Sequence, residues 1–231
     1  MSIFANMSST GLEESQDSLG GFSLLESDIY EATIKALYAT TAKSGAMALN
    51  IVADINGREY RETVYVTNKE GQNFFVKSNK KIPLPGFVTI NDLCLCGIGK
   101  ELSELDTEEK VVNIYNVEQK KEVPTPVPMI VEMIGAKVAL GIHKETVNKR
   151  VLSGDTYVES NETREQNRIN KVFDLESHKT VHEGKAGAEA TFWDKWLEKY
   201  KGKTLDRAKK GDNAPKAAPA ATAPRKSLFG K

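Results

Sequence analysis

The sequence predicts a mainly β protein of the α+β class, built on a small, partly closed antiparallel barrel of the OB type. Apolar residues alternate with small or polar ones over 47–55, a period that belongs to a half-buried strand. Asn56-Gly57 follows directly and favours a two-residue hairpin turn. Five or six short strands, interrupted by one helical segment after the third, suit this barrel. A β-sandwich is the alternative architecture.

The first three strands are predicted to form an antiparallel meander. Alternation over 30–39 marks the first, and Lys43-Ser44-Gly45 provides a turn into 47–55. The return strand is expected over 58–66. After it come a turn at 68–71, a short strand at 74–76 and a basic, proline-containing loop over 77–86. We expect the remaining elements to be arranged around this sheet.

The pattern changes to helical spacing over 88–105, with Asn91 or Asp92 able to cap a helix. The glycines at 97 and 99 favour two shorter helical pieces. Further strands are expected at 111–117, 129–134 and 137–142, and the proline-rich segment 120–128 cannot lie in the centre of a sheet. A helix is also expected over 161–172, and a second one over 186–200, where aromatic residues recur at a spacing of four.

The chain is expected to divide into four regions: a flexible acidic arm over 1–27, an OB-like domain over 28–152 that contains the DNA-binding candidates named below, a helical extension over 153–203 that packs on the barrel, and a disordered basic Ala/Pro tail over 204–231. Because the acidic start and the basic end cancel, the formal net charge is zero. This argues against a protein that acts through bulk basic character. No secretion signal or membrane-spanning run is evident, so a cytoplasmic protein is expected.

No complete catalytic motif occurs, and we expect neither catalytic residues nor a cofactor. Gly97-Ile98-Gly99-Lys100 has the end of a phosphate-binding loop, but Glu101 stands where Ser or Thr should bind magnesium. Zinc is a weaker alternative, with the ligands that this possibility would require at Cys94, Cys96, His178 and His182. The Cys-x-Cys spacing is not that of a zinc knuckle, and buried free cysteines are the preferred interpretation.

Nucleic-acid binding has the most support from the residues themselves. A binder of single strands needs cations that meet phosphates and aromatic faces on which unstacked bases rest. The strand parity places Arg61 and Tyr65 on the outward face and makes Tyr60 a candidate for the core. Tyr and Phe are also ordinary strand formers, and Lys-rich loops are ordinarily just solvated. The candidate binding residues are Tyr38, Lys43, Arg58, Arg61, Tyr65, Lys69, Phe74, Phe75, Lys77, Lys80 and Lys81.

Several runs of sequence carry a family resemblance: YEATIKALY (30–38), KSGAM (43–47), NGREYR (56–61), LPGFVTINDLCL (84–95), VNKR (147–150) and NRINKVF (167–173). Over roughly residues 28–200 the chain resembles bacteriophage single-stranded DNA-binding proteins of the podovirus type. The resemblance implies an OB-like protein that coats and protects single-stranded DNA during phage DNA replication, recombination and repair in the host cytoplasm.

The tail departs from the pattern of many single-strand binders, which end in an acidic tail with an apolar tip. Here the tail is basic, although Leu228 and Phe229 keep an apolar end that could contact phage replication proteins. The alternative function is a phage interaction or adaptor protein, with an OB-like or sandwich domain and no role with nucleic acid.

Overall fold

The computed structural model describes residues 23–116, 119–153 and 156–209. The arm before Ser23 and the tail after Lys209, including Leu228 and Phe229, lie outside the described residues. Within them, no helix has both the length and the apolar character needed to cross a membrane.

The predicted meander is confirmed. It consists of β1 (Asp28–Thr41), β2 (Met47–Ile55) and β3 (Arg58–Tyr65), all antiparallel, with Ile51 opposite both Leu37 and Glu62. Asn56 and Gly57 have φ values of 53° and 77°, as a type I′ turn between right-twisted strands requires. The alternate residues of β2 are buried in the core, because the two-residue period points every second side chain to the same face.

The basic segment expected as a loop over 77–86 is a hairpin. Strand β4 (Phe74–Lys77) pairs with β5 (Lys80–Pro83) in a small separate sheet. Ser78 and Asn79 both have positive φ, so a tight turn is made without glycine. The amide of Leu84 donates to the carbonyl of Asn73 at 2.9 Å and closes the base of this hairpin.

The helical segment is divided in two, as its glycines predicted. Helix α1 (Pro85–Ile98) ends at Gly99 in the left-handed conformation, and the short 3-10 helix η1 (Leu102–Glu104) follows. The expected caps are wrong, because α1 begins at Pro85, before either of them. Asn91 instead accepts a hydrogen bond from the Leu102 amide at 2.9 Å, and Asp92 forms an ion pair with Lys171 at 2.7 Å.

A second hairpin, formed by β6 (Glu108–Asn116) and β7 (Lys121–Met129), replaces the expected proline-rich connection. The prolines at 124, 126 and 128 are every second residue, so their nitrogens all face away from β6 and no ladder hydrogen bond is lost. The strand expected over 129–134 is wrong, since η2 (Val131–Met133) is a 3-10 helix. The hairpin packs on the outer face of β1 and β2, where Val127 and Met129 are buried.

The largest correction concerns the second half of the chain. The strand expected over 137–142 continues as β8 (Lys137–Ser153), and the helix expected over 161–172 is wrong because those residues belong to β9 (Thr156–Phe173). These two strands pair from Ala139–Phe173 out to Ser153–Thr156, so a long ladder satisfies the backbone of a very polar sequence. The expected boundary at 152/153 therefore falls at the end of β8, next to the connection between the paired strands.

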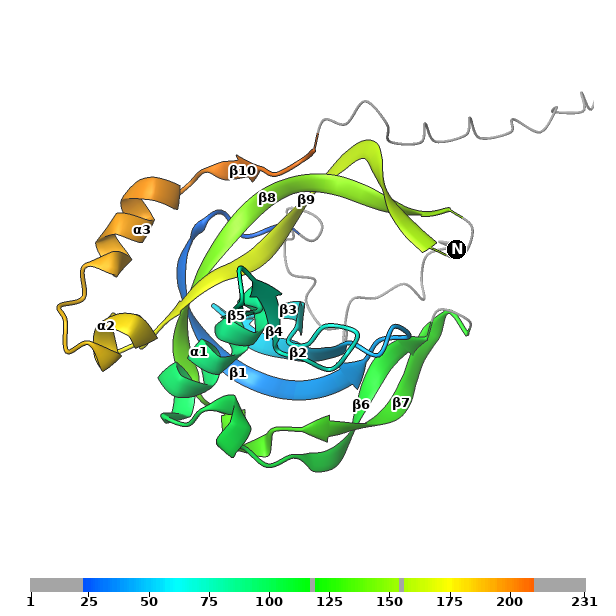
Figure 1. The fold of residues 1–231 in the computed structure, drawn as a ribbon, viewed down its shortest axis with the longest axis horizontal. Helices are drawn as coiled ribbons and strands as arrows, with labels where there is room; N and C mark the ends of the chain where they lie inside the picture. Colours follow the sequence, from blue (N-terminus) through cyan, green and yellow to red (C-terminus); the bar gives the residue numbers. More distant parts are fainter. Residues whose placement is uncertain (1–22, 117–118, 154–155, 210–231) are drawn as a thin grey trace, which may run out of the picture.

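The main sheet is antiparallel apart from one short parallel pairing, and its strand order is β3-β2-β1-β8-β9 (Figure 1). The parallel strand is β10 (Thr204–Asp206), beside β8. Helix α1 packs against β3, β8 and β9, and its Ile90 and Leu93 are completely buried. Helix α3 (Phe192–Tyr200) begins later than expected and buries Trp196 against Ala139 and Phe173. The short helix α2 (Val181–Lys185) precedes it.

Gly86 fixes how closely α1 approaches β3. A Cβ atom added at Gly86 would lie 2.1 Å from the carbonyl oxygen of Tyr65, whereas one added at Gly184 has no atom within 4 Å. We expect Gly86→Ala to lower the free energy of unfolding by about 1–3 kcal/mol through overpacking. The control Gly184→Ala, in α2, should raise it by up to about 1 kcal/mol. Urea unfolding of both variants checks this, and an unchanged midpoint for Gly86→Ala would contradict it.

Candidate nucleic-acid interface

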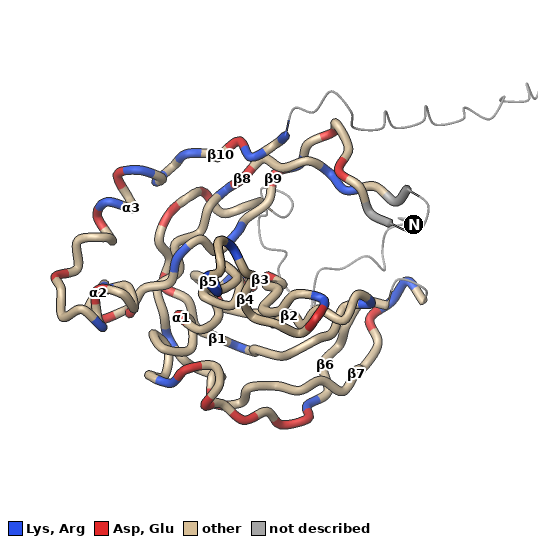
Figure 2. The backbone as a smooth tube through the Cα atoms, in the orientation of Figure 1, with Lys and Arg blue, Asp and Glu red and all other residues tan. Residues whose placement is uncertain are grey.

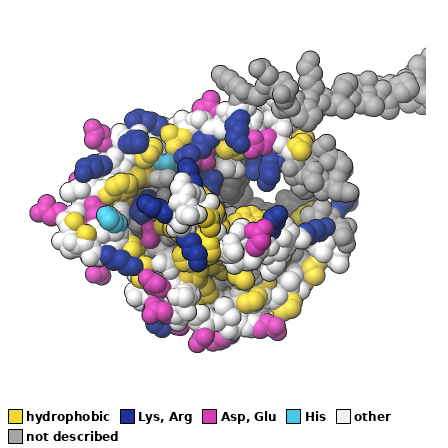
Figure 3. Space-filling model, in the orientation of Figure 1, with side chains coloured by type: hydrophobic (Ala, Val, Ile, Leu, Met, Phe, Trp, Pro, Cys, Tyr) yellow, Lys and Arg dark blue, Asp and Glu magenta, His cyan; other side chains and the backbone are white. Residues whose placement is uncertain are grey.

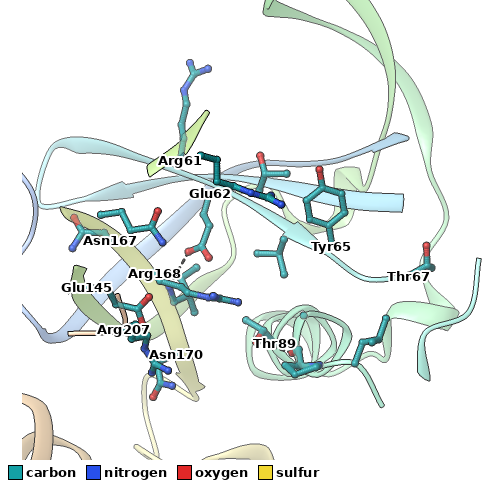
Figure 4. A pocket seen from close by; sticks show the side chains of 18 of the residues that line it. Arg61, Glu62, Tyr65, Thr67, Thr89, Glu145, Asn167, Arg168, Asn170 and Arg207 are labelled. Atoms are coloured by element: carbon teal, nitrogen blue, oxygen red, sulfur yellow. Dashed lines mark hydrogen bonds and ion pairs between the residues drawn. The ribbon is translucent and has the colours of Figure 1, made fainter. Parts of the chain in front are cut away.

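The two outermost strands of the main sheet, β3 and β9, line a groove of about 920 Å³ (Figure 4). The first turn of α1 closes one side, and Glu145 and Arg207 contribute to another. We call this cavity the β3–β9 groove. Four arginines line it, together with two carboxylates and several amide and hydroxyl side chains. The arginines are Arg61, Arg150, Arg168 and Arg207.

No backbone ladder joins β3 to β9 in the described part of the chain, and a side chain bridges them instead. The carboxylate of Glu62, on β3, accepts hydrogen bonds from the Ile169 amide of β9 at 2.8 Å and from the Tyr60 hydroxyl at 2.6 Å. Burial raises the pKa of Glu62, and Arg168 opposes that rise. Burial and the nearby Glu62 raise the pKa of Tyr60, which keeps its hydroxyl a donor.

The bridge predicts a pH-dependent stability. The pKa of Glu62 is raised in the folded state, so protonation of this side chain stabilises the fold. That contribution to the free energy of unfolding is complete below the ordinary carboxyl pKa and is lost as pH rises through the raised pKa. Glu62→Gln keeps an acceptor but does not titrate. Between about pH 4 and about pH 8 the wild type should therefore lose stability that the variant keeps, so the difference in free energy of unfolding shifts in favour of the variant. Glu62→Ala should cost about 1–3 kcal/mol, since it leaves two donors unpaired. Urea unfolding at both pH values tests this, and parallel pH profiles for Gln and wild type would contradict it.

Two of the four groove arginines are already occupied by carboxylates. Arg207 Nε lies 2.6 Å from the buried Glu145 carboxylate, and Arg61 Nε lies 2.6 Å from Glu59 on the outer face of β3. Figure 4 shows Arg61 directed away from Arg168. Arg150 and Arg168 are exposed and have no ion-pair partner in the described ranges. These two cations are therefore free to bind phosphate.

One exposed aromatic residue also lines the groove. Tyr65 lines the groove and is 54% exposed, whereas Tyr60 is 8% exposed in the core. The parity prediction, with Arg61 and Tyr65 outward and Tyr60 inward, is confirmed. Tyr38 is only 8% exposed because Val127 of the β6–β7 hairpin packs on it, so its expected role as a stacking surface is wrong. Sequence parity identifies the outer face but does not show what covers it.

Most other predicted residues lie near the Tyr65 end of the groove. Thr67 and Asn68 line it, and Lys69 follows directly in the same turn. That turn contacts the β1–β2 turn of Lys43, since a Cβ atom on Gly45 would lie 3.1 Å from the Lys69 carbonyl oxygen. Arg58 is not part of this group. It lies at the other end of β3, where its guanidinium donates to the Ser23 carbonyl.

The β4–β5 hairpin holds the remaining predicted residues, next to Leu84 and Pro85 of the groove. The ammonium of Lys81 lies 4.6 Å from the centre of the Phe74 ring, and Phe75 is 41% exposed. Its three lysines are exposed and form no ion pair with any described residue. They are Lys77, Lys80 and Lys81.

Several basic residues lie around one hollowed face of the molecule. Figure 2 shows Lys and Arg on the β4–β5 hairpin, on the outer part of β8 and β9, and at the tip of the β6–β7 hairpin. The space-filling view is hollowed between these elements, and Lys and Arg side chains lie on both sides of the hollow (Figure 3). Lys and Arg therefore lie on several sides of this concave surface, although the net charge is zero and other Lys and Arg residues lie elsewhere, as on α3 and beside β10.

The four residues considered for zinc are not brought together. Cys94 is buried in the core, and burial raises the pKa values of both Cys94 and Cys96 to about 12. His178 stacks on Trp193, with ring centres 4.0 Å apart, and His182 lies in α2. Within the described ranges, no three His, Cys, Asp or Glu side chains are grouped so as to hold a metal ion.

Sequence reasoning missed Arg150, Arg168 and Arg207, because the segment around Arg168 was expected to be a helix. A signal was present. Gly154-Asp155 is a turn dipeptide between two segments of similar length, and Arg164, Gln166 and Arg168 recur with the two-residue period of a strand.

Searches with the whole chain against protein-family models, curated proteins and solved structures find no match.

Proposed function

We propose that this protein binds single-stranded DNA without sequence preference and coats it during phage DNA replication, recombination and repair. The observation that carries the proposal is the β3–β9 groove. It is lined by Arg150 and Arg168, neither of which pairs with a carboxylate of a described residue, and by Tyr65, which is 54% exposed. Guanidinium groups meet phosphates, and an accessible ring accepts an unstacked base. The protein's role in this proposal is to hold the strand, with no bond made or broken.

We further propose that the main sheet is an OB-type barrel with an open seam. Its strand order β3-β2-β1-β8-β9 supports this assignment. So does the position of α1, which follows β3 and precedes β8 along the chain, that is, between the third and fourth barrel strands in chain order. OB folds bind oligonucleotides on the second and third strands and on the loops that follow the first and fourth. In this chain these parts are β2, β3, the Lys43 turn and the outer ends of β8 and β9.

Single strands are favoured over duplex for a chemical reason. In a duplex the base faces are stacked on one another and cannot reach Tyr65, whereas the phosphates stay available to the arginines. Duplex therefore keeps only the electrostatic part of the binding energy. The β4–β5 hairpin adds three further cations at the Tyr65 end, where they can continue the path of the backbone.

The test is fluorescence anisotropy with labelled oligo-dT, an oligonucleotide of mixed sequence and the matching duplex, at several salt concentrations. We expect similar affinities for the two single strands, weaker binding of the duplex, and a steep loss of affinity with salt. Binding of neither single strand at low salt would overturn the proposal and favour a protein-interaction role. Equal affinity for duplex and single strand would contradict the proposal that bases stack on Tyr65.

A further inference from the structure

The β6–β7 hairpin has two outer edges, and only one of them is suited to accept another strand. On β7, Pro124, Pro126 and Pro128 direct their nitrogens to the outer edge, and proline has no N–H to donate there. On β6, no proline or glycine occurs, and no described strand pairs with its outer edge. The hairpin is therefore blocked along the prolines of β7 and open along β6.

The β6–β7 ladder determines which backbone groups of β6 point to the open edge. Pro126 lies opposite Val111, and Pro124 lies opposite Asn113. Because the proline nitrogens face away from β6, these are non-hydrogen-bonded pairs, in which both residues turn their N–H and C=O groups outward. The two-residue period extends this direction to Tyr115. Val111, Asn113 and Tyr115 therefore present donors and acceptors along the open edge.

The same stretch of β6 carries apolar side chains on both faces. On the outer face Val111 is 67% exposed and Tyr115 is 58% exposed. On the inner face Val112 and Ile114 pack against the apolar cluster that β1 and β7 form. The charged residues of β6 all precede this stretch, at 108–110, so no charge within 111–115 opposes the addition of a strand.

We infer that β6 pairs along its open edge with β6 of a second copy of this chain, in the antiparallel direction, with Asn113 on the two-fold axis. An antiparallel pair of identical strands is self-complementary, as a two-fold dimer requires. Outward backbone groups can pair only with outward groups, so the possible registers differ by steps of two residues.

The side chains select among these registers. With Asn113 on the axis, Val111 lies opposite the partner's Tyr115 on the outer face. On the inner face, Val112 lies opposite the partner's Ile114. Apolar pairs then occur on both faces, the axis repeats each of them, and such cross-strand pairs stabilise a sheet. Registers centred one or two residues earlier instead place the lysine at 110 opposite an apolar residue of the inner face.

This contact is separate from the β3–β9 groove, since no residue of β6 or β7 lines that groove. It therefore goes beyond the proposed function and is tested without nucleic acid. Two paired edge strands bury a small area, so we expect a weak dimer. Sedimentation velocity of the full chain between about 1 µM and about 200 µM should show an average mass that rises with concentration toward that of a dimer.

A matched pair of substitutions tests the surface. Val111→Lys should weaken dimerisation by about 2- to 30-fold, because the axis repeats each cross-strand pair that is lost. The control is Val76→Lys on β4, the same substitution at a residue that is 62% exposed, and it should leave the dimer unchanged. A mass that stays monomeric throughout, or equal effects of the two variants, would overturn the inference.

A disulfide test reports the register directly. Asn113→Cys places two thiols at the axis, where the Cα atoms of a hydrogen-bonded pair lie about 5.5 Å apart, within the range of a disulfide. The control Glu109→Cys is also exposed, but its two copies would lie about 26 Å apart in this register. With an added mild oxidant we expect a covalent dimer from Asn113→Cys alone, and the wild type reports any cross-link through Cys94 or Cys96. Equal cross-linking of the two variants would show that the strands do not pair in this way.

Discussion

Arg150→Gln/Arg168→Gln is expected to weaken binding of oligo-dT by about 50- to 100-fold at about 50 mM salt. Each phosphate contact on a single strand contributes a slope of about 0.7 to the dependence of log affinity on log salt. Losing two contacts therefore flattens the slope by about 1.4. If the variant and the wild type have equal affinity at about 1 M salt, this difference in slope gives the expected loss of affinity at about 50 mM salt. Titration by anisotropy at several salt concentrations measures both quantities.

The matched control is Lys35→Gln/Lys195→Gln, which removes two exposed cations that do not line the groove. It reproduces the change in net charge and should lower the affinity only slightly. Arg150 and Arg168 are exposed and make no ion pair with described residues, so their loss should change the unfolding midpoint only modestly, through the lost attraction between Arg168 and the Glu62 carboxylate. Equal effects of the two double variants would show that net charge, and not the groove, determines binding.

Tyr65→Ala is expected to weaken single-strand binding by about 5- to 150-fold, the equivalent of about 1–3 kcal/mol for one stacked base. The effect should persist at high salt, because stacking involves no counterion release. Binding of duplex should change little. Anisotropy titrations with both ligands, at low and high salt, distinguish this loss from the salt-dependent loss produced by the arginine variants.

Two substitutions serve as comparisons. Tyr65→Phe keeps the ring and should bind within about twofold of the wild type, since every base stacks on an aromatic face whatever its substituent. Tyr38→Phe alters a tyrosine that the β6–β7 hairpin covers, and it too should leave binding unchanged. If Tyr65→Ala behaves like Tyr65→Phe, the bases do not rest on this ring and the path of the strand must lie elsewhere.

The meander and the facing of its side chains followed from local patterns in the sequence. Alternation over 47–55 and the Asn56-Gly57 dipeptide specify a hairpin whose register follows from the turn, so the outward facing of Tyr65 and the burial of Tyr60 were predictable. Gly99 likewise marked the end of α1, because a left-handed residue terminates a helix. Each of these features depends on residues that are close together in the chain.

Only the tertiary structure decided the composition of the groove. The polar segment of β9 is a strand because it pairs with β8. The two-residue period of Arg164, Gln166 and Arg168 was present in the sequence, but on its own it did not decide between a strand and a helix. Tyr38 is covered by a hairpin about 90 residues away in sequence. Arg150, Arg168 and Tyr65 line one groove only because the main sheet curls until β9 approaches β3. The sequence alone thus determined which residues face outward in the first three strands. Pairing and packing between distant segments decided which cations and rings share one surface, because such contacts leave no local pattern.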